Sequence, residues 1–149
     1  MAAFEIGDDG PSALVVGVDG SDTGWRAFHY AVGLARRQGS RVVAVYAENL
    51  PGGAFAGTGA LALPVLDTSA EELRTELRTT VEALGAEHGV PTELVVAAAD
   101  PVLALATVAE EVRADAILVG ASTQAAHRLF GSVGVRAVRA GRWPVTVVP

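Results

Sequence analysis

The sequence predicts a three-layer α/β/α sandwich, in which four helices cover the two faces of a five-stranded parallel sheet. Five short apolar runs lack polar alternation, which is typical of strands that are buried on both faces. Segments of helical periodicity separate these runs and are long enough to return the chain for parallel pairing. Of the 149 residues, 50% are hydrophobic but only 5% are aromatic. This composition favours one domain with a core of valine, leucine and alanine.

The first strand-helix-strand unit lies near the N-terminus. Residues 13–18 read ALVVGV, an uninterrupted apolar run that indicates a buried strand. A break of acidic, glycine and serine residues follows, and either Ser21 or Asp22 can cap a helix that Gly39 ends. Residues 42–47 form the next apolar run, so the unit closes with a second buried strand.

The middle of the chain begins with an unusual connection. Residues 51–64 read PGGAFAGTGALALP, which is too long for a simple link in a compact domain and is predicted to be mobile or to act as a lid. The sequence SAEE, from Ser69 to Glu72, matches a capping box and predicts a helix that ends at Gly89. Residues 94–98 are then expected to form the third strand.

The C-terminal part repeats the alternation of helix and strand. Asp100 and Pro101 combine an N-cap with a proline at the first helical position. The fourth strand is expected at 116–119, and the last helix at 132–140. Residues 145–148 form a short final strand, which is a candidate for an exposed edge that pairs with a second subunit.

The chain is predicted to hold one domain, residues 12–149, after a flexible, turn-rich tail at residues 1–11. The patterns above leave the order of the strands in the sheet open. The N-terminus lacks the features of a signal peptide, and no apolar run approaches the roughly 18 residues of a membrane span. We therefore expect a cytoplasmic protein that does not insert into membranes.

Charge and composition exclude several kinds of chemistry. The formal net charge is -6 and all 11 basic residues are arginine, which disfavours nucleic-acid binding. The absence of lysine excludes a Walker lysine and a Schiff base. The chain has no cysteine, and His29, His88 and His127 lack the spacing of metal ligands. No metal site is predicted.

Two chain reversals at strand ends carry the candidate site residues. Asp19 follows the first strand, where its carboxylate could accept hydrogen bonds from a ribose or a base, or could only cap its own turn. After the fourth strand, Gly120 and the Gly131-Ser132 pair bracket a loop that holds Ser122 and Thr123. A phosphate could accept from the N–H groups of 131–133 at the following helix N-terminus and from the hydroxyls of Ser132 and Ser122. The alternative is an ordinary N-cap and a surface loop. Strands one and four would be neighbours at the switch point of a doubly wound sheet, so the reversals could form one cleft.

Three stretches of the sequence resemble the universal stress protein family. They are VVGVDGS at 15–21, VYAE at 45–48, and the segment 119–148, which contains GSVGVRAVRAGRWPVTVV. The resemblance implies the strand order 3-2-1-4-5, a homodimer joined partly through the last strand, and ATP binding in many members but not in others. Carried over by position, it implies that Val18 and Asp19 flank adenine and ribose, that Tyr46 lies beside the base, and that Gly120, Gly131, Ser132 and Val133 hold phosphates.

The loop departs from the ATP-binding pattern of that family, which reads G-x-x-G, nine residues, then G-[ST]. Thr123 stands in place of the second glycine, only seven residues separate it from Gly131, and Gly134 replaces a frequent hydroxyl residue. A β-branched residue resists both positive φ and a close backbone approach to phosphates. We therefore expect weakened or altered binding of an adenine nucleotide, namely ATP, AMP or cyclic AMP.

Three functions follow as hypotheses. The first is a cytoplasmic, dimeric regulatory protein that binds an adenine nucleotide and is not an enzyme. The second is an interaction module of the same fold that binds no nucleotide and acts on an unknown protein partner. The third is a slow ATP hydrolase, which is disfavoured because the sequence supplies neither a general base nor a convincing Mg²⁺ site.

Overall fold

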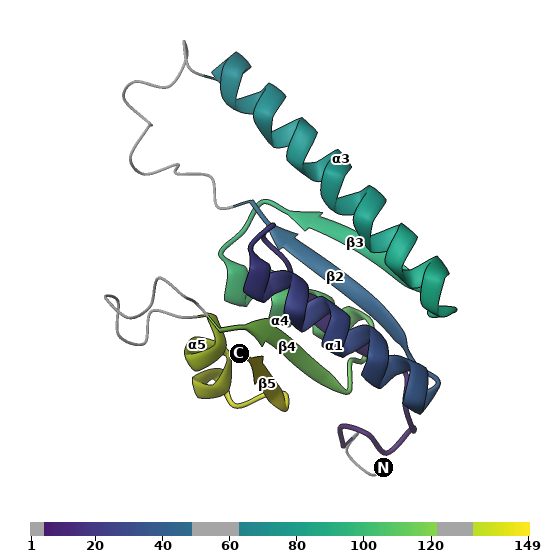
Figure 1. Ribbon diagram of the computed structural model, residues 1–149. Helices are drawn as coiled ribbons and strands as arrows, with labels where there is room; N and C mark the ends of the chain where they lie inside the picture. Colours follow the sequence, from purple (N-terminus) through teal and green to yellow (C-terminus); the bar gives the residue numbers. More distant parts are fainter. Residues whose placement is uncertain (1–4, 49–62, 122–132) are drawn as a thin grey trace.

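A computed structural model describes residues 5–48, 63–121 and 133–149 of the chain, without the side chains of 63–68 (Figure 1). Five strands and four helices alternate over these ranges, as predicted. In chain order they are β1 (Ala13–Gly17), α1 (Asp22–Gln38), β2 (Arg41–Ala47), α3 (Leu63–His88), β3 (Thr92–Ala97), α4 (Pro101–Glu111), β4 (Ala116–Gly120), α5 (Val133–Ala140) and β5 (Val145–Val148).

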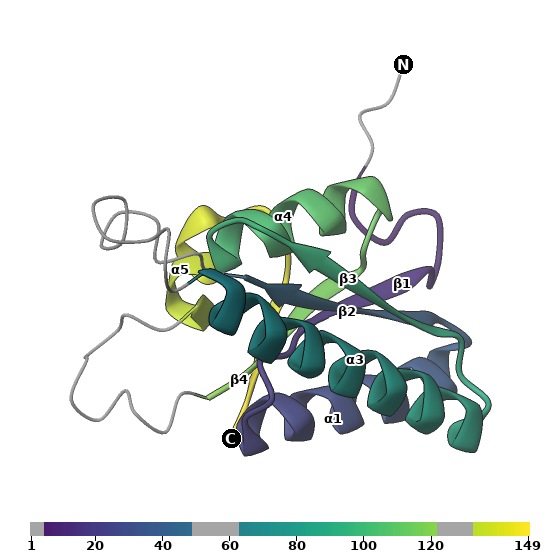
Figure 2. The same ribbon diagram turned by 90° about the horizontal axis from the view of Figure 1, so that it is seen from above.

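The strands form one sheet in the order β3-β2-β1-β4-β5, with every neighbouring pair parallel. This confirms the order that the family resemblance implies. Helices α1 and α3 cover one face of the sheet, and α4 and α5 cover the other (Figure 2). Because the chain moves outward from β1 to β3 and then restarts with β4 on the other side of β1, the switch point lies between β1 and β4. Strand β5 lies at one edge.

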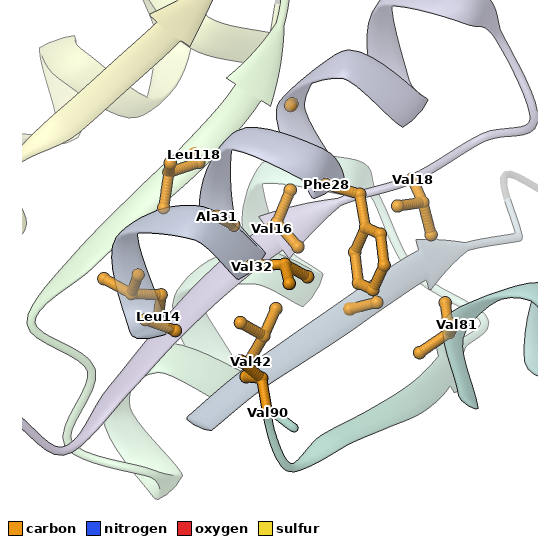
Figure 3. Close-up of a cluster of buried hydrophobic side chains, with 13 residues drawn as sticks. Leu14, Val16, Val18, Phe28, Ala31, Val32, Val42, Val81, Val90 and Leu118 are labelled. Carbon is orange, nitrogen blue, oxygen red and sulfur yellow. The ribbon is translucent and has the colours of Figure 1, made fainter. Parts of the chain in front are cut away.

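Two apolar clusters fill the spaces between the layers. Beneath α1 and α3, the ring of Phe28 is fully buried among valines of the central strands, and Val81 joins them from α3 (Figure 3). Beneath α4, Leu105 and Ala109 pack against the opposite side chains of β1, β2 and β4. The central strands are buried on both faces, as their uninterrupted apolar runs predict.

Local signals place most helix ends correctly. Ser21 is the N-cap of α1, where its hydroxyl accepts a hydrogen bond from the Gly24 N–H at 3.1 Å. Gly39 ends that helix in the left-handed conformation with φ 77°. Asp100 caps α4, and Pro101 takes the first helical position. These termini follow from short-range chemistry, since the capping group and the helix are adjacent in sequence.

Two predicted boundaries are wrong by two residues or more, and several strand ends differ by one residue. Helix α3 begins at Leu63, so Ser69 lies inside the helix and is not its N-cap. Pro64 thus belongs to α3 rather than to the preceding connection. A proline is tolerated near a helix start because the first N–H groups need no helical partner. Strand β3 begins at Thr92, earlier than expected, because it pairs in register with β2 from Val42 onward. The rest of the predicted mobile segment, 51–62, lies outside the described residues.

The N-terminal rim of the sheet is fixed by one carboxylate. Asp115, just before β4, accepts hydrogen bonds from the backbone N–H groups of Ser12 at 2.7 Å and Ala13 at 3.1 Å. These bonds tie the start of β1 to the start of β4. Of the predicted tail, residues 1–4 lie outside the described part. Within the described ranges, no helix combines the length and apolarity that crossing a membrane requires.

Candidate functional site

The β1–α1 turn holds the first candidate residues. Val18 is buried, and its N–H donates to the carbonyl of Val45 at 3.0 Å. The exposed Asp19 accepts hydrogen bonds at Oδ1 from the N–H of Ser21, at 2.9 Å, and from the Ser21 hydroxyl. Asp19 therefore caps its own turn, as the alternative interpretation proposed. Both bonds end on Oδ1, so Oδ2 has no partner among the described residues and can accept from a ligand.

Gly120, at the end of β4, lies directly against the start of α1. A Cβ at this position would be 2.4 Å from the carbonyl carbon and oxygen of Thr23, and 2.8 Å from the nitrogen of Gly24. Only glycine permits this approach between two backbones. The register pairs Val16 with Leu118, so β1 and β4 end side by side. The two chain reversals thus meet at one rim of the sheet.

Strand β2 contributes Tyr46 and Glu48 to the same rim. Tyr46 is half-buried against the cluster that contains Phe28. Burial raises the pKa of the Tyr46 phenol, the carboxylates of Glu48 and Asp19 raise it further, and the Arg74 guanidinium works against them. The Tyr46 hydroxyl therefore lies within reach of the charges of Glu48, Arg74 and Asp19.

Helix α3 closes this side of the rim with Arg74. Its Nε donates to Oε1 of Glu48, and its second terminal nitrogen donates to Oε2 of Glu48 at 2.8 Å. The remaining nitrogen donates to Glu71 at 2.9 Å. The hydrogen bond to Glu48 is the main reason that the pKa of Arg74 is raised. The Glu48 side chain is only 14% exposed, so this two-pronged pair fixes α3 to the end of β2.

The start of α5 borders the rim on its other side. Val133 is half-buried and packs on the cluster beneath α4. Gly134 faces the sheet, and a Cβ there would lie 2.9 Å from Val147 and 3.1 Å from Val119. The hydroxyl residue that is frequent in the family at this position would therefore collide with the two valines. Gly134 is a packing residue in this chain.

An ion pair connects α5 to α4. One terminal nitrogen of Arg136 donates to both carboxylate oxygens of Asp100, each at 2.9 Å. Partial burial works to raise the pKa of Asp100, but the hydrogen bonds from Arg136 and from the N–H groups of Leu103 and Val102 outweigh it, so the pKa lies below its ordinary value. Asp100 thus caps α4 and anchors α5 with one side chain.

The structure places part of the predicted set. Val18, Asp19, Tyr46, Gly120 and Val133 are described and border the C-terminal ends of the strands, whereas Ser122, Thr123, Gly131 and Ser132 lie outside the described residues.

Sequence reasoning missed the pairing of Glu48 with Arg74. The stretch VYAE ends at Glu48, but no signal in the sequence indicates which residue of α3 would reach it. Within the described ranges, no group of three or more His, Cys, Asp or Glu side chains could hold a metal ion.

In this doubly wound parallel sheet, the turns after β1 and β4 meet at one rim. This arrangement defines a class of α/β domains that bind ligands in a cleft beyond the carboxyl ends of the strands. A family model described as the universal stress protein family matches residues 12–149. The chain belongs to the universal stress protein family. Among curated proteins, none matches the sequence.

Solved structures agree with this assignment. A universal stress protein from Burkholderia pseudomallei is 27% identical with a TM-score of 0.71, and the match covers 92% of this chain and 95% of that one. A universal stress protein in complex with cAMP is 26% identical with a TM-score of 0.62, covering 93% and 97%. A universal stress protein from Archaeoglobus fulgidus is 26% identical with a TM-score of 0.66, covering 93% of each.

Proposed function

We propose that this protein binds an adenine nucleotide in a cleft at the C-terminal ends of β1 and β4 and acts as a regulatory protein rather than an enzyme. The observation that carries the proposal is the close approach of Gly120 to Thr23 and Gly24, which brings the β4 end against the turn that presents Asp19. The similar structure in complex with cAMP supports the choice of ligand.

Each part of the proposed cleft has a chemical role. The free Oδ2 of Asp19 accepts from a ribose hydroxyl, and Val18 and Tyr46 provide the apolar wall for the base. Gly120 and the backbone at Val133 lie on the side where phosphate is expected. Ser122, Thr123, Gly131 and Ser132, which lie outside the described residues, are proposed to contribute to phosphate binding from the sequence alone. An adenine nucleotide would thus lie across the end of the sheet, from β2 towards α5. The proposal assigns no site to Mg²⁺.

The direct test is calorimetric titration of the wild-type protein with ATP, AMP and cyclic AMP. We expect binding of at least one of them, weakened about tenfold or more by Asp19→Ala because a hydrogen bond to a charged group is lost. Glu82→Gln, which removes an exposed carboxylate on α3, is the control for the change in net charge. Absence of binding by all three nucleotides would refute the proposal.

A second candidate is a dimeric interaction module that binds no nucleotide and serves an unknown protein partner. The packing of Gly134 beneath Val119 and Val147 favours it, because the usual hydroxyl donor has no room there. Mass spectrometry of the purified protein separates the two candidates: a co-purified nucleotide supports the first and a ligand-free protein the second.

We also propose a homodimer that pairs through β5, and a cytoplasmic location. Strand β5 is an edge strand, and Val147 on it is 49% exposed, which suits pairing with a second copy. Removal of residues 145–149 should shift the protein towards monomer in sedimentation. An unchanged dimer would exclude this interface.

A further inference from the structure

The Glu48–Arg74 pair lies where the proposed site would receive the base. Tyr46 lies in β2 and Glu48 directly follows that strand. The Glu48 N–H donates to the carbonyl of Ala97 at 2.8 Å, which continues the ladder, so the side chains of Tyr46 and Glu48 lie on the same side of the sheet. Leu73, which precedes Arg74, lies beside the β1–α1 turn: its Cδ1 would be 3.6 Å from a Cβ added to Gly20. This part of α3 therefore borders both the turn of Asp19 and the end of β2.

All three nitrogens of the Arg74 guanidinium are engaged by carboxylates. Two of them donate to the two oxygens of Glu48, and the third donates to Glu71. Arg74 thus holds Glu48 through both oxygens in the two-pronged mode, so a second two-pronged donor cannot bind the carboxylate in the same way. The pair is neutral and presents no open two-pronged acceptor to the base.

Without Arg74, Glu48 would be a strong acceptor. Its side chain is only 14% exposed. An ionised carboxylate that is so little exposed and has lost its partner destabilises the protein until another donor binds it. Guanine presents two adjacent donors, N1–H and the N2 amino group, which match two carboxylate oxygens. Adenine presents one amino group beside an acceptor nitrogen, and that acceptor is repelled by a carboxylate.

We infer that Arg74 is a specificity-determining residue for the proposed nucleotide site: by holding both oxygens of Glu48, it blocks the two-pronged acceptor that would select guanine. The inference rests on the proposed function, since it concerns the base of the same ligand. Arg74 acts through Glu48 and need not contact the nucleotide. Its effect is on the choice of base and not on the phosphates.

The test compares nucleotides that differ only in the base: ATP with GTP, AMP with GMP, and cyclic AMP with cyclic GMP, by calorimetric titration. In Arg74→Met, we expect the ratio of adenine to guanine affinity to fall about tenfold or more, the size of one hydrogen bond to a charged group. The double variant Arg74→Met with Glu48→Gln should restore the wild-type ratio. Glu71→Gln, which leaves the Glu48 pair intact, should not change it.

The outcomes distinguish the inference from the function on which it rests. If the wild-type protein binds an adenine nucleotide and Arg74→Met keeps the same base preference, only the inference fails. If the wild-type protein binds no adenine nucleotide, the proposed function fails and the inference falls with it.

Circular dichroism checks that Arg74→Met is folded. Should that variant unfold, Arg74→Lys takes its place. Lysine is a point charge that cannot hold both oxygens in a fork, so a smaller fall in the ratio is expected, and an unchanged ratio overturns the inference.

Discussion

Replacing Gly120 by alanine tests the backbone contact that brings the two chain reversals together. The new Cβ would lie 2.4 Å from the carbonyl carbon and oxygen of Thr23, about 1 Å closer than the 3.4 Å at which ordinary contacts begin. Since the opposing atoms are backbone, no side chain can rotate away, and β4 and α1 must separate. Overpacking of this kind typically costs about 1–3 kcal/mol, and we expect the upper part of that range.

Two other glycines provide matched controls. A Cβ at Gly17, at the end of β1, would meet Leu105 and Val119 at 3.7 Å, which is ordinary contact. A Cβ at Gly33, in the middle of α1, would have nothing within 4 Å. Gly17→Ala should therefore be nearly neutral, and Gly33→Ala should stabilise the protein by about 0.5–1 kcal/mol because alanine is the better helix former.

Urea unfolding followed by far-ultraviolet circular dichroism measures all three variants at one protein concentration, because a dimer would make stability depend on concentration. The expected order of the free energy of unfolding is Gly33→Ala, then wild type and Gly17→Ala, then Gly120→Ala. A Gly120→Ala protein as stable as Gly17→Ala would show that β4 and α1 are not in close contact, and the geometric basis of the proposed cleft would be lost.

Three further predictions concern stability. Because the folded pKa of Asp100 is lowered, its ionised form stabilises the fold above the unfolded pKa of about 3.9, and this stabilisation is lost as pH falls through the folded pKa. Arg136→Met should cost a few tenths of a kcal/mol of stability at pH 7, since the pair is partly exposed. The urea midpoints of variant and wild type should approach each other towards pH 3, and a constant difference between them would contradict the reasoning. Asp115→Ala leaves two backbone N–H groups without their acceptor and should cost about 1–3 kcal/mol in thermal unfolding, with an unchanged Tm as the opposing result. Leu77→Ala, at a side chain that is 1% exposed, should cost about 2–5 kcal/mol, while Leu103→Ala, at one that is 60% exposed, should change stability by less than about 0.5 kcal/mol; equal losses would refute the assignment of the core.

The features that sequence predicted correctly are those with local causes. Asp100 caps α4 as predicted, and Ser21, one of the two residues proposed for the cap of α1, caps that helix. Gly39 ends α1 because the left-handed conformation suits glycine. The order of the strands is different in kind, because apolar runs do not say which strand lies beside which. It followed only from the family resemblance.

One missed feature is local: the capping-box pattern at Ser69 predicts a helix start there, although α3 begins at Leu63. Another has its cause far along the chain. Glu48 and Arg74 are 26 positions apart, and nothing in the sequence selects Arg74 over Arg78 on the same helix. That pairing is decided by packing in the folded structure.

The contact of Gly120 with Thr23 joins residues from opposite ends of the polypeptide. During synthesis, the N-terminal half can form β1, α1 and β2 and present the acidic turn, but the opposing wall arrives only when β4 has been made. Contacts between distant segments are slow to form because the loop between them must first be closed. We therefore expect the proposed cleft to assemble late in folding, after β4 has been made.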